Sequence, residues 1–204
     1  VHWSEAYARQ VIKRKPDKDE YIVESGITPS GIVHAGNFRE VMTQDFVYRA
    51  LLKLGVNARY QYIWDDYDRF RKVPANVPEN WKKEAEEYIG LPVSKTPDPW
   101  GCHNSYSKHF ASKLIEENEA CGVEADYIWM SEEYQKCTFA ENMKIALENR
   151  DSIKGILDDY RKEPLPESWM PVRVYCDKCG KDTTRVEYLE DYRLRYRCEC
   201  GHSG

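Results

Sequence analysis

The residue types that could do chemistry are most concentrated in one short segment. Residues 24–37 read Glu-Ser-Gly-Ile-Thr-Pro-Ser-Gly-Ile-Val-His-Ala-Gly-Asn and join the apolar run 21–23 to a long amphipathic segment. A turn between a strand and a helix gathers unpaired backbone amides and the positive end of the helix dipole, which together bind anions. Gly26 and Gly31 permit close backbone approach and unusual dihedral angles, and Pro29 stiffens the turn. The segment therefore predicts a seat for the phosphates of a nucleotide.

Side chains of this turn could also contact such a ligand. Thr28 and Ser30 add hydroxyl donors, and His34 stands where the helix should begin. Asn37 follows three positions later, so on a helix it shares a face with His34. The pattern is neither a P-loop nor the dinucleotide-binding G-x-G-x-x-G. A purely structural role for His34 is the alternative, which we do not favour.

Four of the seven cysteines form two closely spaced pairs. Cys176-Asp-Lys-Cys179 and Cys198-Glu-Cys200-Gly-His202 flank 18 residues with a β pattern, which is the layout of a zinc ribbon. Either Cys200 or His202 could be the fourth ligand, and we favour Cys200. Buried cysteines of a reduced hairpin are the alternative, but so short a unit has little core of its own.

A second metal candidate combines Asp98, Cys102, His103 and His109. Their side chains converge if the turn at residues 99–101 folds Asp98 back over the start of the next helix. The alternative is a capping aspartate beside an ordinary pair of helical histidines, and the residues alone do not decide between the two.

A cluster of aspartates could receive a cationic substrate. Asp65, Asp66 and Asp68 follow an alternating segment, and Glu24 is a further candidate for the same task. Carboxylates at a strand end are what an ammonium group needs. The equally weighted alternative is a loop in which these carboxylates pair with the basic residues of 69–72.

Three strings, in order along the chain, carry a resemblance to a known family. Pro29-Ser-Gly-Ile-Val-His-Ala-Gly-Asn37 resembles the HIGH motif of class I aminoacyl-tRNA synthetases, with the last His replaced by Asn. Trp64-Asp-Asp-Tyr-Asp-Arg-Phe-Arg-Lys-Val-Pro74 and Asp98-Pro-Trp-Gly-Cys-His103, together with residues 23–31, narrow this to the class I lysyl-tRNA synthetases. The resemblance runs through nearly all of the 204 residues.

The resemblance implies an α/β fold, with a Rossmann-like parallel sheet, a HIGH-type nucleotide-binding turn and a small zinc-ribbon unit. It implies that lysine and ATP form lysyl-adenylate, that tRNA(Lys) then receives the lysine, and that Mg²⁺ and one or two structural Zn²⁺ ions take part. The residues assigned to ATP are Thr28, Pro29, Ser30, His34, Gly36 and Asn37, of which His34 and Asn37 are expected to be catalytic. Those assigned to lysine are Gly26, Thr28, Asp65, Asp66 and Asp68.

One departure from the family pattern concerns completeness. No string matches the Lys-Met-Ser-Lys-Ser motif of class I synthetases, and the sequence ends at Gly204 without an anticodon-binding domain. We therefore expect the amino-terminal part of a synthetase, which binds ATP or lysine weakly and does not turn over efficiently. The alternative functions are another HIGH-type nucleotidyltransferase, or a zinc-ribbon module that binds RNA without catalysis.

The elements that must position these residues begin with a βαβ unit. A leading helix over 4–15, a strand at 21–24, a helix ending at Gly55 and a strand at 58–65 are predicted. This order gives a parallel sheet with a right-handed crossover, whose ligands bind beyond the carboxyl ends of the strands. Residues 69–101 hold five prolines and predict an irregular insertion around one short helix, 79–88.

Helices over 104–121 and 139–161 and a strand at 126–130 complete a predicted first domain, residues 1–165. The pattern then changes to short β runs, which predict a zinc-ribbon-like unit over 166–204. These runs are 172–175, 184–189 and 194–197.

Composition limits the class of protein. Hydrophobic content of 41% and charged content of 32% are typical of a soluble globular chain, and no apolar run approaches the roughly 20 residues of a membrane span. A net charge of −5 argues against a general polyanion binder, so any tRNA contact should be local. No secretory signal is recognisable, and the odd number of cysteines favours a reducing cytoplasm. No pattern indicates an oligomeric state.

Overall fold

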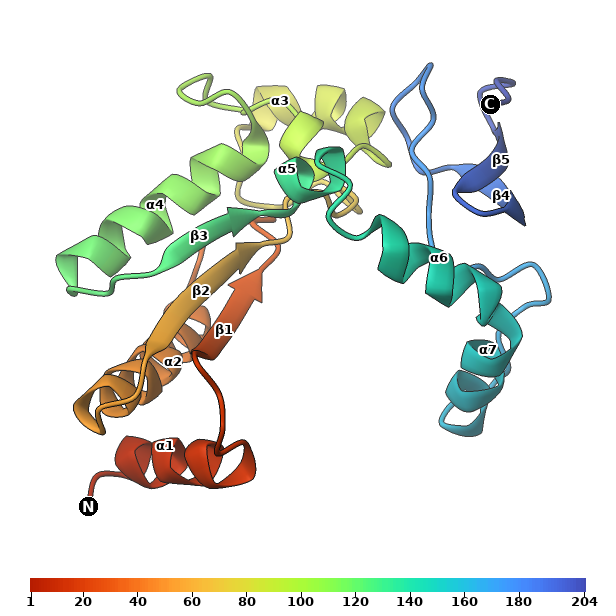
Figure 1. Ribbon diagram of the computed structural model, residues 1–204. Coiled ribbons are helices and arrows are strands. Elements are labelled where there is room, and N and C mark those ends of the chain that lie inside the picture. The colour runs from red at the N-terminus through yellow and green to blue at the C-terminus, as the bar shows by residue number, and fades with distance from the viewer.

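A three-stranded parallel sheet forms the centre of the first part of the chain. The structure, a computed structural model, describes all residues from Val1 to Gly204. The strands stand in the order β1 (Tyr21–Ile27), β2 (Ala58–Trp64) and β3 (Asp126–Trp129), as Figure 1 shows. The connections pass through α2 (Ala35–Lys53) and α4 (Tyr106–Ala120). The predicted parallel βαβ arrangement is confirmed.

Both crossover helices pack against the same face of the sheet. On that face, Tyr60 of β2 reaches the backbone of Val41 in α2, and Tyr127 of β3 bonds to Asn118 in α4. Helix α1 (Trp3–Arg14) packs against α2 and forms an outer layer. Because the strands are parallel, their carboxyl ends meet at one edge, where ligands of such sheets bind.

Stacked aromatic side chains hold the strand ends in place. Trp64 at the end of β2 is fully buried, and its ring stacks on Trp129 at the end of β3, with 5.6 Å between ring centroids. Tyr62 packs edge-on against Trp64 at 4.9 Å. Such pairs stabilise the core beyond the area they bury, so the loops that follow these strands start from fixed points.

The proline-rich segment has a core of its own. It contains α3 (Glu79–Ala85), which continues into the 3₁₀ turn η1 (Glu86–Tyr88), and the 3₁₀ turn η2 (Val93–Lys95). The predicted short helix over 79–88 is therefore present as two consecutive helical pieces. A cluster of seven buried residues joins this segment to the start of α4: Phe70, Val77, Trp81, Ala85, Val93, Tyr106 and Phe110.

An arm of two helices leads away from the sheet (Figure 1). The prediction of one helix over 139–161 is wrong, because α6 (Ala140–Glu148) and α7 (Arg150–Asp159) are separate. At Asn149 the backbone leaves helical dihedrals, and its side-chain amide donates to the carbonyl of Ile145 (2.8 Å). Such local bonds compete with helix continuation. None of the helices has the length and apolar character that a membrane crossing needs.

The paired cysteines border an antiparallel hairpin of β4 (Thr184–Glu190) and β5 (Arg193–Cys198). The predicted strand at 172–175 is wrong. That segment has no strand partner; instead the hydroxyl of Tyr175 donates to the carbonyl of Tyr67 (2.8 Å) and joins the segment before the hairpin to the loop after β2. The division into domains 1–165 and 166–204 stays a prediction.

Candidate functional site

The turn between β1 and α2 rests on a neighbouring helix. Pro29 is buried in it. The hydroxyl of Tyr106, the first residue of α4, donates a hydrogen bond to the carbonyl of Ser30 (2.9 Å). This hydrogen bond anchors the turn to α4 at the carboxyl edge of the sheet. The side of the turn that faces away from α4 is open to solvent.

His34 caps the N-terminus of α2. Its Nδ1 atom accepts a hydrogen bond from the Gly36 amide (3.1 Å), and Oδ1 of Asn37 accepts one from the His34 amide (3.4 Å). A ring nitrogen that accepts carries no proton, so the neutral ring holds its proton on Nε2. The His34 side chain is exposed, so its Nε2–H group can donate to an anion at the positive helix end. The structural and the ligand roles are therefore compatible.

The glycines of this region differ in what surrounds them. A Cβ at Gly36 would lie 3.0 Å from the His34 ring, so glycine lets the ring fold over the helix start. At Gly26 a Cβ would lie 2.5 Å from the carbonyl oxygen of Ile63 in β2. Gly31 has open space, and neither Gly26 nor Gly31 has a positive φ. The predicted close approach holds at Gly26, but the predicted unusual dihedral angles occur at neither residue.

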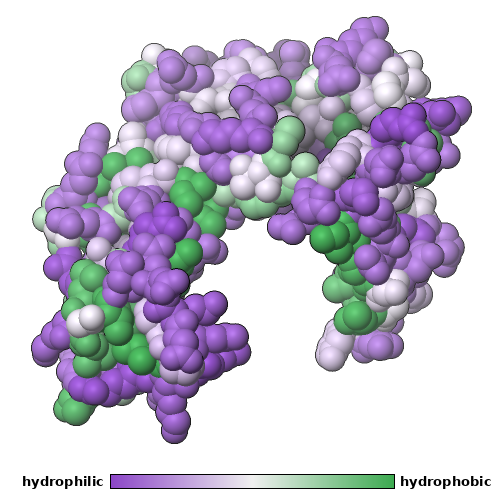
Figure 2. All heavy atoms as spheres, in the orientation of Figure 1, coloured by the Kyte–Doolittle hydropathy of each residue, from purple (hydrophilic) through white to green (hydrophobic).

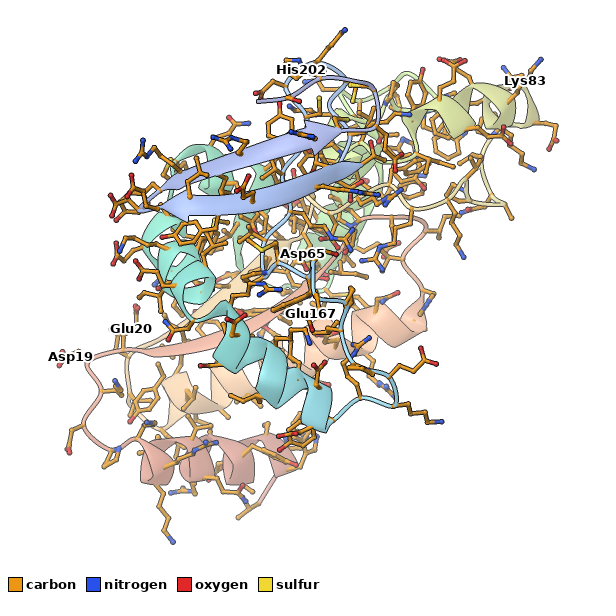
Figure 3. The ribbon with its side chains drawn as sticks, turned by 90° about the vertical axis from the view of Figure 1, so that its right-hand side faces the viewer. Asp19, Glu20, Asp65, Lys83, Glu167 and His202 are labelled. Atoms are coloured by element: carbon orange, nitrogen blue, oxygen red, sulfur yellow. The ribbon has the colours of Figure 1, made fainter.

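The loop after β2 meets the end of β1. The Asp65 amide donates to the carbonyl of Ile27 (3.0 Å), and the Thr28 hydroxyl donates to the Asp68 carboxylate (2.7 Å). Asp68 is exposed and Asp65, labelled in Figure 3, is half-buried. Burial raises the pKa of Asp65, and the negative charges of Asp68 and Asp66 raise it further. Two carboxylates held this way favour a cation beside them.

Asp66 has a different environment from its neighbours. It is fully buried, and its carboxylate oxygens accept from the amide (2.8 Å) and hydroxyl (2.6 Å) of Ser131 in α5 (Met130–Gln135). Asp66 thus joins β2 to α5, and this position gives no support to the prediction that it holds lysine. The alternative, in which these aspartates pair with the basic residues of 69–72, is not supported either, since Arg69 pairs instead with Asp182 (3.4 Å).

A cavity of about 950 Å³ opens beside Asp65 and Asp68. Its other walls come from α5, α6 and the segment before the first cysteine pair. The lining side chains with distinctive chemistry include Tyr67, Arg69, Tyr134 and Arg173, whereas Glu24, Thr28 and His34 do not line it. Sequence reasoning found the acidic end and missed the other walls, because no local pattern links residues so far apart in the chain. The string 64–74 could have drawn attention to Tyr67.

The four paired cysteines converge on one point. The Sγ atoms of Cys176 and Cys200 are 3.8 Å apart, those of Cys179 and Cys198 are 3.6 Å apart, and all four lie within 4.8 Å of one another. Disulfide sulfurs are about 2.05 Å apart, whereas four sulfurs about 2.3 Å from one zinc ion stand about 3.8 Å apart. The spacing and the donors fit tetrahedral Zn²⁺. His202 lies outside this group, and its carbonyl accepts from the Cys198 amide (2.8 Å).

Charge in this cluster also suits a cation. The backbone amide of Cys200 and the hydroxyl of Thr183 lower the pKa of Cys198 to about 6. For Cys179, the Lys181 amide acts to lower the pKa, but burial and the neighbouring thiols outweigh it and raise the pKa to about 12. Four thiols this close cannot all ionise unless positive charge lies between them, and thiolates are the form that binds zinc.

The second metal candidate also converges. Sγ of Cys102 lies 3.3 Å from Oδ2 of Asp98 and 3.2 Å from Nδ1 of both His103 and His109. Nδ1 of His109 lies 3.3 Å from Oδ1 of Asp98. One carboxylate, one thiol and two imidazoles form a donor set that zinc accepts. His103 lies in the turn before α4, so the alternative of two helical histidines is wrong.

Surrounding groups orient these donors. Asp98 accepts from the backbone amides of Cys102 (2.9 Å) and His103 (2.8 Å), so its predicted turn-capping role coexists with the cluster. Nε2 of His103 bonds to the hydroxyl of Ser112 (3.0 Å), the kind of second bond that fixes a metal-binding imidazole. Burial lowers the pKa of His109 and favours its neutral form, which is the form that binds metal.

The parallel sheet and its crossover helices fit the Rossmann-like domain of a class I aminoacyl-tRNA synthetase. Within that class, the chain belongs to the family described as tRNA synthetases class I (K), whose family model matches residues 1–204. Membership of this family agrees with the resemblance carried by the three sequence strings 29–37, 64–74 and 98–103. It gives no support to the alternative of another HIGH-type nucleotidyltransferase.

The relatives with similar sequences have names that agree with this family assignment. The chain is 46% identical over 208 residues to the lysine–tRNA ligase of Pyrococcus horikoshii. It is 48% identical over 201 residues to that of Thermococcus kodakarensis and 41% identical over 205 residues to that of Treponema pallidum. These matches cover 97 to 100% of this chain and 38 to 39% of the relatives, so the chain spans about two fifths of their length.

Proposed function

We propose that this chain takes part in the ATP-dependent activation of lysine and its transfer to tRNA(Lys). A carboxylate oxygen of lysine attacks the α-phosphorus of ATP, the bond to the pyrophosphate oxygen breaks, and lysyl-adenylate forms. A terminal ribose hydroxyl of the tRNA then attacks the lysyl carbonyl carbon, and AMP leaves with the hydroxyl proton on a phosphate oxygen. The observation that carries the proposal is the His34-capped start of α2 beside the Thr28–Asp68 contact.

The turn before α2 is proposed to bind ATP as a HIGH-type turn. His34 would donate from Nε2–H to a phosphate oxygen, and the helix N-terminus would add positive potential. This chemistry needs positioning and charge stabilisation rather than covalent help from the protein. Mg²⁺, when bound, supplies further neutralisation of phosphate charge. The other residues proposed for ATP are Thr28, Pro29, Ser30, Gly36 and Asn37.

The acidic end of the cavity is proposed to bind the lysine side chain. Asp65 and Asp68 would face the ε-ammonium group, while Gly26 and Thr28 would hold the rest of the amino acid. Asp66 is left out of this set because Ser131 engages both of its carboxylate oxygens.

Each metal cluster is proposed to hold one structural zinc ion. Cys200 is proposed as the fourth ligand of the cysteine cluster because its Sγ lies within 4.8 Å of the other three. The Asp98 cluster would hold the start of α4 in place. Seven free thiols fit a reducing compartment, so a cytoplasmic location is part of the proposal.

Titration calorimetry with ATP and lysine tests the two assignments. Replacing His34 by Ser keeps a helix-capping acceptor but removes the Nε2–H donor. A hydrogen bond to a charged group contributes about 1.5–3 kcal/mol, so ATP binding should weaken roughly tenfold to a hundredfold. Lysine should bind, whereas norleucine, which has no ε-ammonium group, should not. Unchanged ATP binding by His34→Ser, or equal binding of norleucine and lysine, would contradict the proposal.

A further inference from the structure

A second cavity opens at the other end of the sheet, where the strands begin. Its volume of about 540 Å³ falls within the roughly 300–1,000 Å³ that ligand sites occupy. It lies between the carboxyl-terminal halves of α2 and α4 and the first residues of β2 and β3. Glu20, which precedes β1, lies at this end, and Asp65, which follows β2, lies at the other (Figure 3). The residues proposed for ATP, lysine and zinc do not line this cavity, so the proposed function leaves it without a task.

Acidic side chains outnumber basic ones around this second cavity. Glu20, Glu119, Glu124 and Asp126 line it together with one arginine, Arg59. The Arg59 guanidinium lies 3.2 Å from the carboxylate of Glu20 and 4.0 Å from that of Asp126, so it balances charge on that side. Glu119 and Glu124 form no ion pair within the chain. The cavity therefore keeps an excess of negative charge on the side of the two glutamates.

The end of α4 adds to this negative charge. Its last turn holds Glu119 and no basic residue. The carboxyl end of a helix carries a partial negative charge of its own, so a cation beside it is favourable. Arg49 of α2 donates to the carbonyl of Gly122 in the turn after α4, but its charge is balanced by Asp45 (2.7 Å). The helix end thus favours a cation from outside the chain.

Three tyrosines, Tyr48, Tyr60 and Tyr127, form an aromatic wall of the second cavity. The hydroxyl of Tyr60 is engaged with that of Ser25 (2.8 Å), so Tyr60 offers its ring to the cavity rather than its hydroxyl. The ring centroids of Tyr48 and Tyr60 lie 6.3 Å apart. Aromatic faces attract cations and also pack against methylene groups. This tyrosine wall therefore suits a cation that carries a hydrocarbon chain.

A buried amide stands behind the tyrosine wall. Asn118 is fully buried, and its Nδ2 atom donates to the hydroxyl of Tyr127 (3.1 Å), whereas its Oδ1 atom has no partner. The Asn118 side chain thus points at the wall of the cavity with an acceptor unused, and a buried acceptor without a partner is costly. The Tyr127 hydroxyl itself keeps a lone pair for a further donor. Both groups favour a ligand that donates hydrogen bonds, as an ammonium group does.

We propose that the second cavity binds a linear polyamine, with ammonium groups on Glu119 and Glu124 and the connecting methylene groups against the tyrosine wall. Such a ligand would offset the excess of negative charge and would hold the end of α4 beside the start of β3. The inference goes beyond the proposed function and does not depend on it, because it concerns the opposite end of the sheet.

The occupant is an extended organic cation rather than a metal ion. Two groups of metal-ligating side chains converge within 4.8 Å, and both are the zinc candidates; none of the four carboxylates of the second cavity belongs to either group. Mg²⁺ and Ca²⁺ need several oxygens at about 2.0–2.6 Å from one point. Carboxylates that stand apart, with aromatic rings between them, instead suit several ammonium groups joined by methylene groups.

Titration calorimetry with spermidine, a linear triamine, tests the inference at constant ionic strength. We expect one spermidine to bind per chain. Butylamine, which has a single ammonium group, should bind about fivefold more weakly or worse, because it loses at least one carboxylate contact. Neither Mg²⁺ nor lysine should displace spermidine. The absence of spermidine binding, its displacement by lysine, or tighter binding of Mg²⁺ or of a tetralysine peptide would overturn the inference.

Variants of the cavity walls locate the contact. The double variant Glu119→Gln with Glu124→Gln should weaken spermidine binding about tenfold, because two carboxylate contacts are lost. Glu116→Gln is the matched control, since it removes the same charge from an exposed position of the same helix outside the cavity. Tyr48→Leu should weaken binding about threefold to tenfold, whereas Tyr48→Phe, which keeps the ring, should not. Equal binding by the double variant and Glu116→Gln would overturn the inference.

A separate measurement keeps this result apart from the proposed function. Urea unfolding of the glutamate and Tyr48 variants shows whether they are folded, and their ATP and lysine binding should match that of the unchanged chain. If ATP and lysine bind but spermidine does not, this inference fails and the proposed function stands. If spermidine binds at the second cavity while ATP and lysine do not bind, the proposed function fails instead.

Discussion

His34 combines two tasks in one ring. Nδ1 closes the start of α2 by accepting from the Gly36 amide, and the proton is therefore directed to Nε2, which faces outward. A helix cap made by an ionised Asp would leave no such donor. The capping geometry thus prepares the ring for an anion before any ligand binds. Glycine at position 36 suits this geometry, since a Cβ there would lie 3.0 Å from the ring and would push it aside by a few tenths of an ångström.

Gly26 should be essential for stability rather than for flexibility. An added Cβ would meet the Ile63 carbonyl oxygen at 2.5 Å, so Gly26→Ala should push β1 away from β2 and lower the free energy of unfolding by about 1–3 kcal/mol. Gly31→Ala is the matched control, because nothing lies within 4 Å of its Cβ position. Urea unfolding of the two variants checks this. Equal stability of both would show that the strands can separate without cost.

For single residues, the sequence indicated where close contacts and acidic clusters lie better than it indicated which groups they contact. Gly26 was expected to admit a close neighbour, and one is present, but it is the next strand. Asp66 carries the same side chain as Asp65 and Asp68, yet both of its carboxylate oxygens accept hydrogen bonds from Ser131, a residue far along the chain. No local pattern distinguishes these aspartates, because burial is decided by the tertiary structure.

Among the elements, the loop after β2 has two separate functions. Asp66 ties the loop to α5 inside the protein, whereas Asp68 reaches Thr28 at the surface. Asp66→Ala should therefore cost about 1–3 kcal/mol of unfolding free energy, because the Ser131 amide and hydroxyl lose buried partners. Asp68→Ala should change stability little and weaken lysine binding. Calorimetry and urea unfolding distinguish these outcomes, and a stable Asp66→Ala variant that loses lysine binding would reverse the assignment.

Helices and strands with a clear periodicity were predictable, and the breaks and connecting segments between them were not. The βαβ unit follows from alternating and helical patterns. The break between α6 and α7 depends on Asn149, whose side chain can either continue a helix or bond to the turn before it. Residues 172–175 carry a strand-like sequence but form no backbone pairing with a strand. The Thr184 hydroxyl donates to the carbonyl of Val174, and the Tyr175 hydroxyl donates to the carbonyl of Tyr67, and these side-chain bonds hold the segment instead.

At the scale of the whole molecule, the chain forms an arch. Figure 2 shows a hollow between the sheet body and the arm of α6 and α7, with apolar surface on both sides of it. The two sides differ in how they are stabilised. Thirteen buried residues form the core around the sheet, whereas three, Cys176, Tyr196 and Cys198, form that of the hairpin unit. A core of three residues is far too small to support a fold, so we expect the hairpin unit to depend on the zinc ion proposed for its cysteine cluster.

Metal removal should therefore unfold the molecule in parts. Elemental analysis should give two zinc ions per chain, and Cys200→Ser should lose one of them while His202→Ala keeps both. A strong chelator should raise hydrogen exchange across residues 172–204 while β1 and β2 stay protected, because the sheet core contains no metal ligand. One ion in the unchanged chain would remove the Asp98 cluster as a zinc site. Loss of an ion in His202→Ala, with retention in Cys200→Ser, would make His202 the fourth ligand.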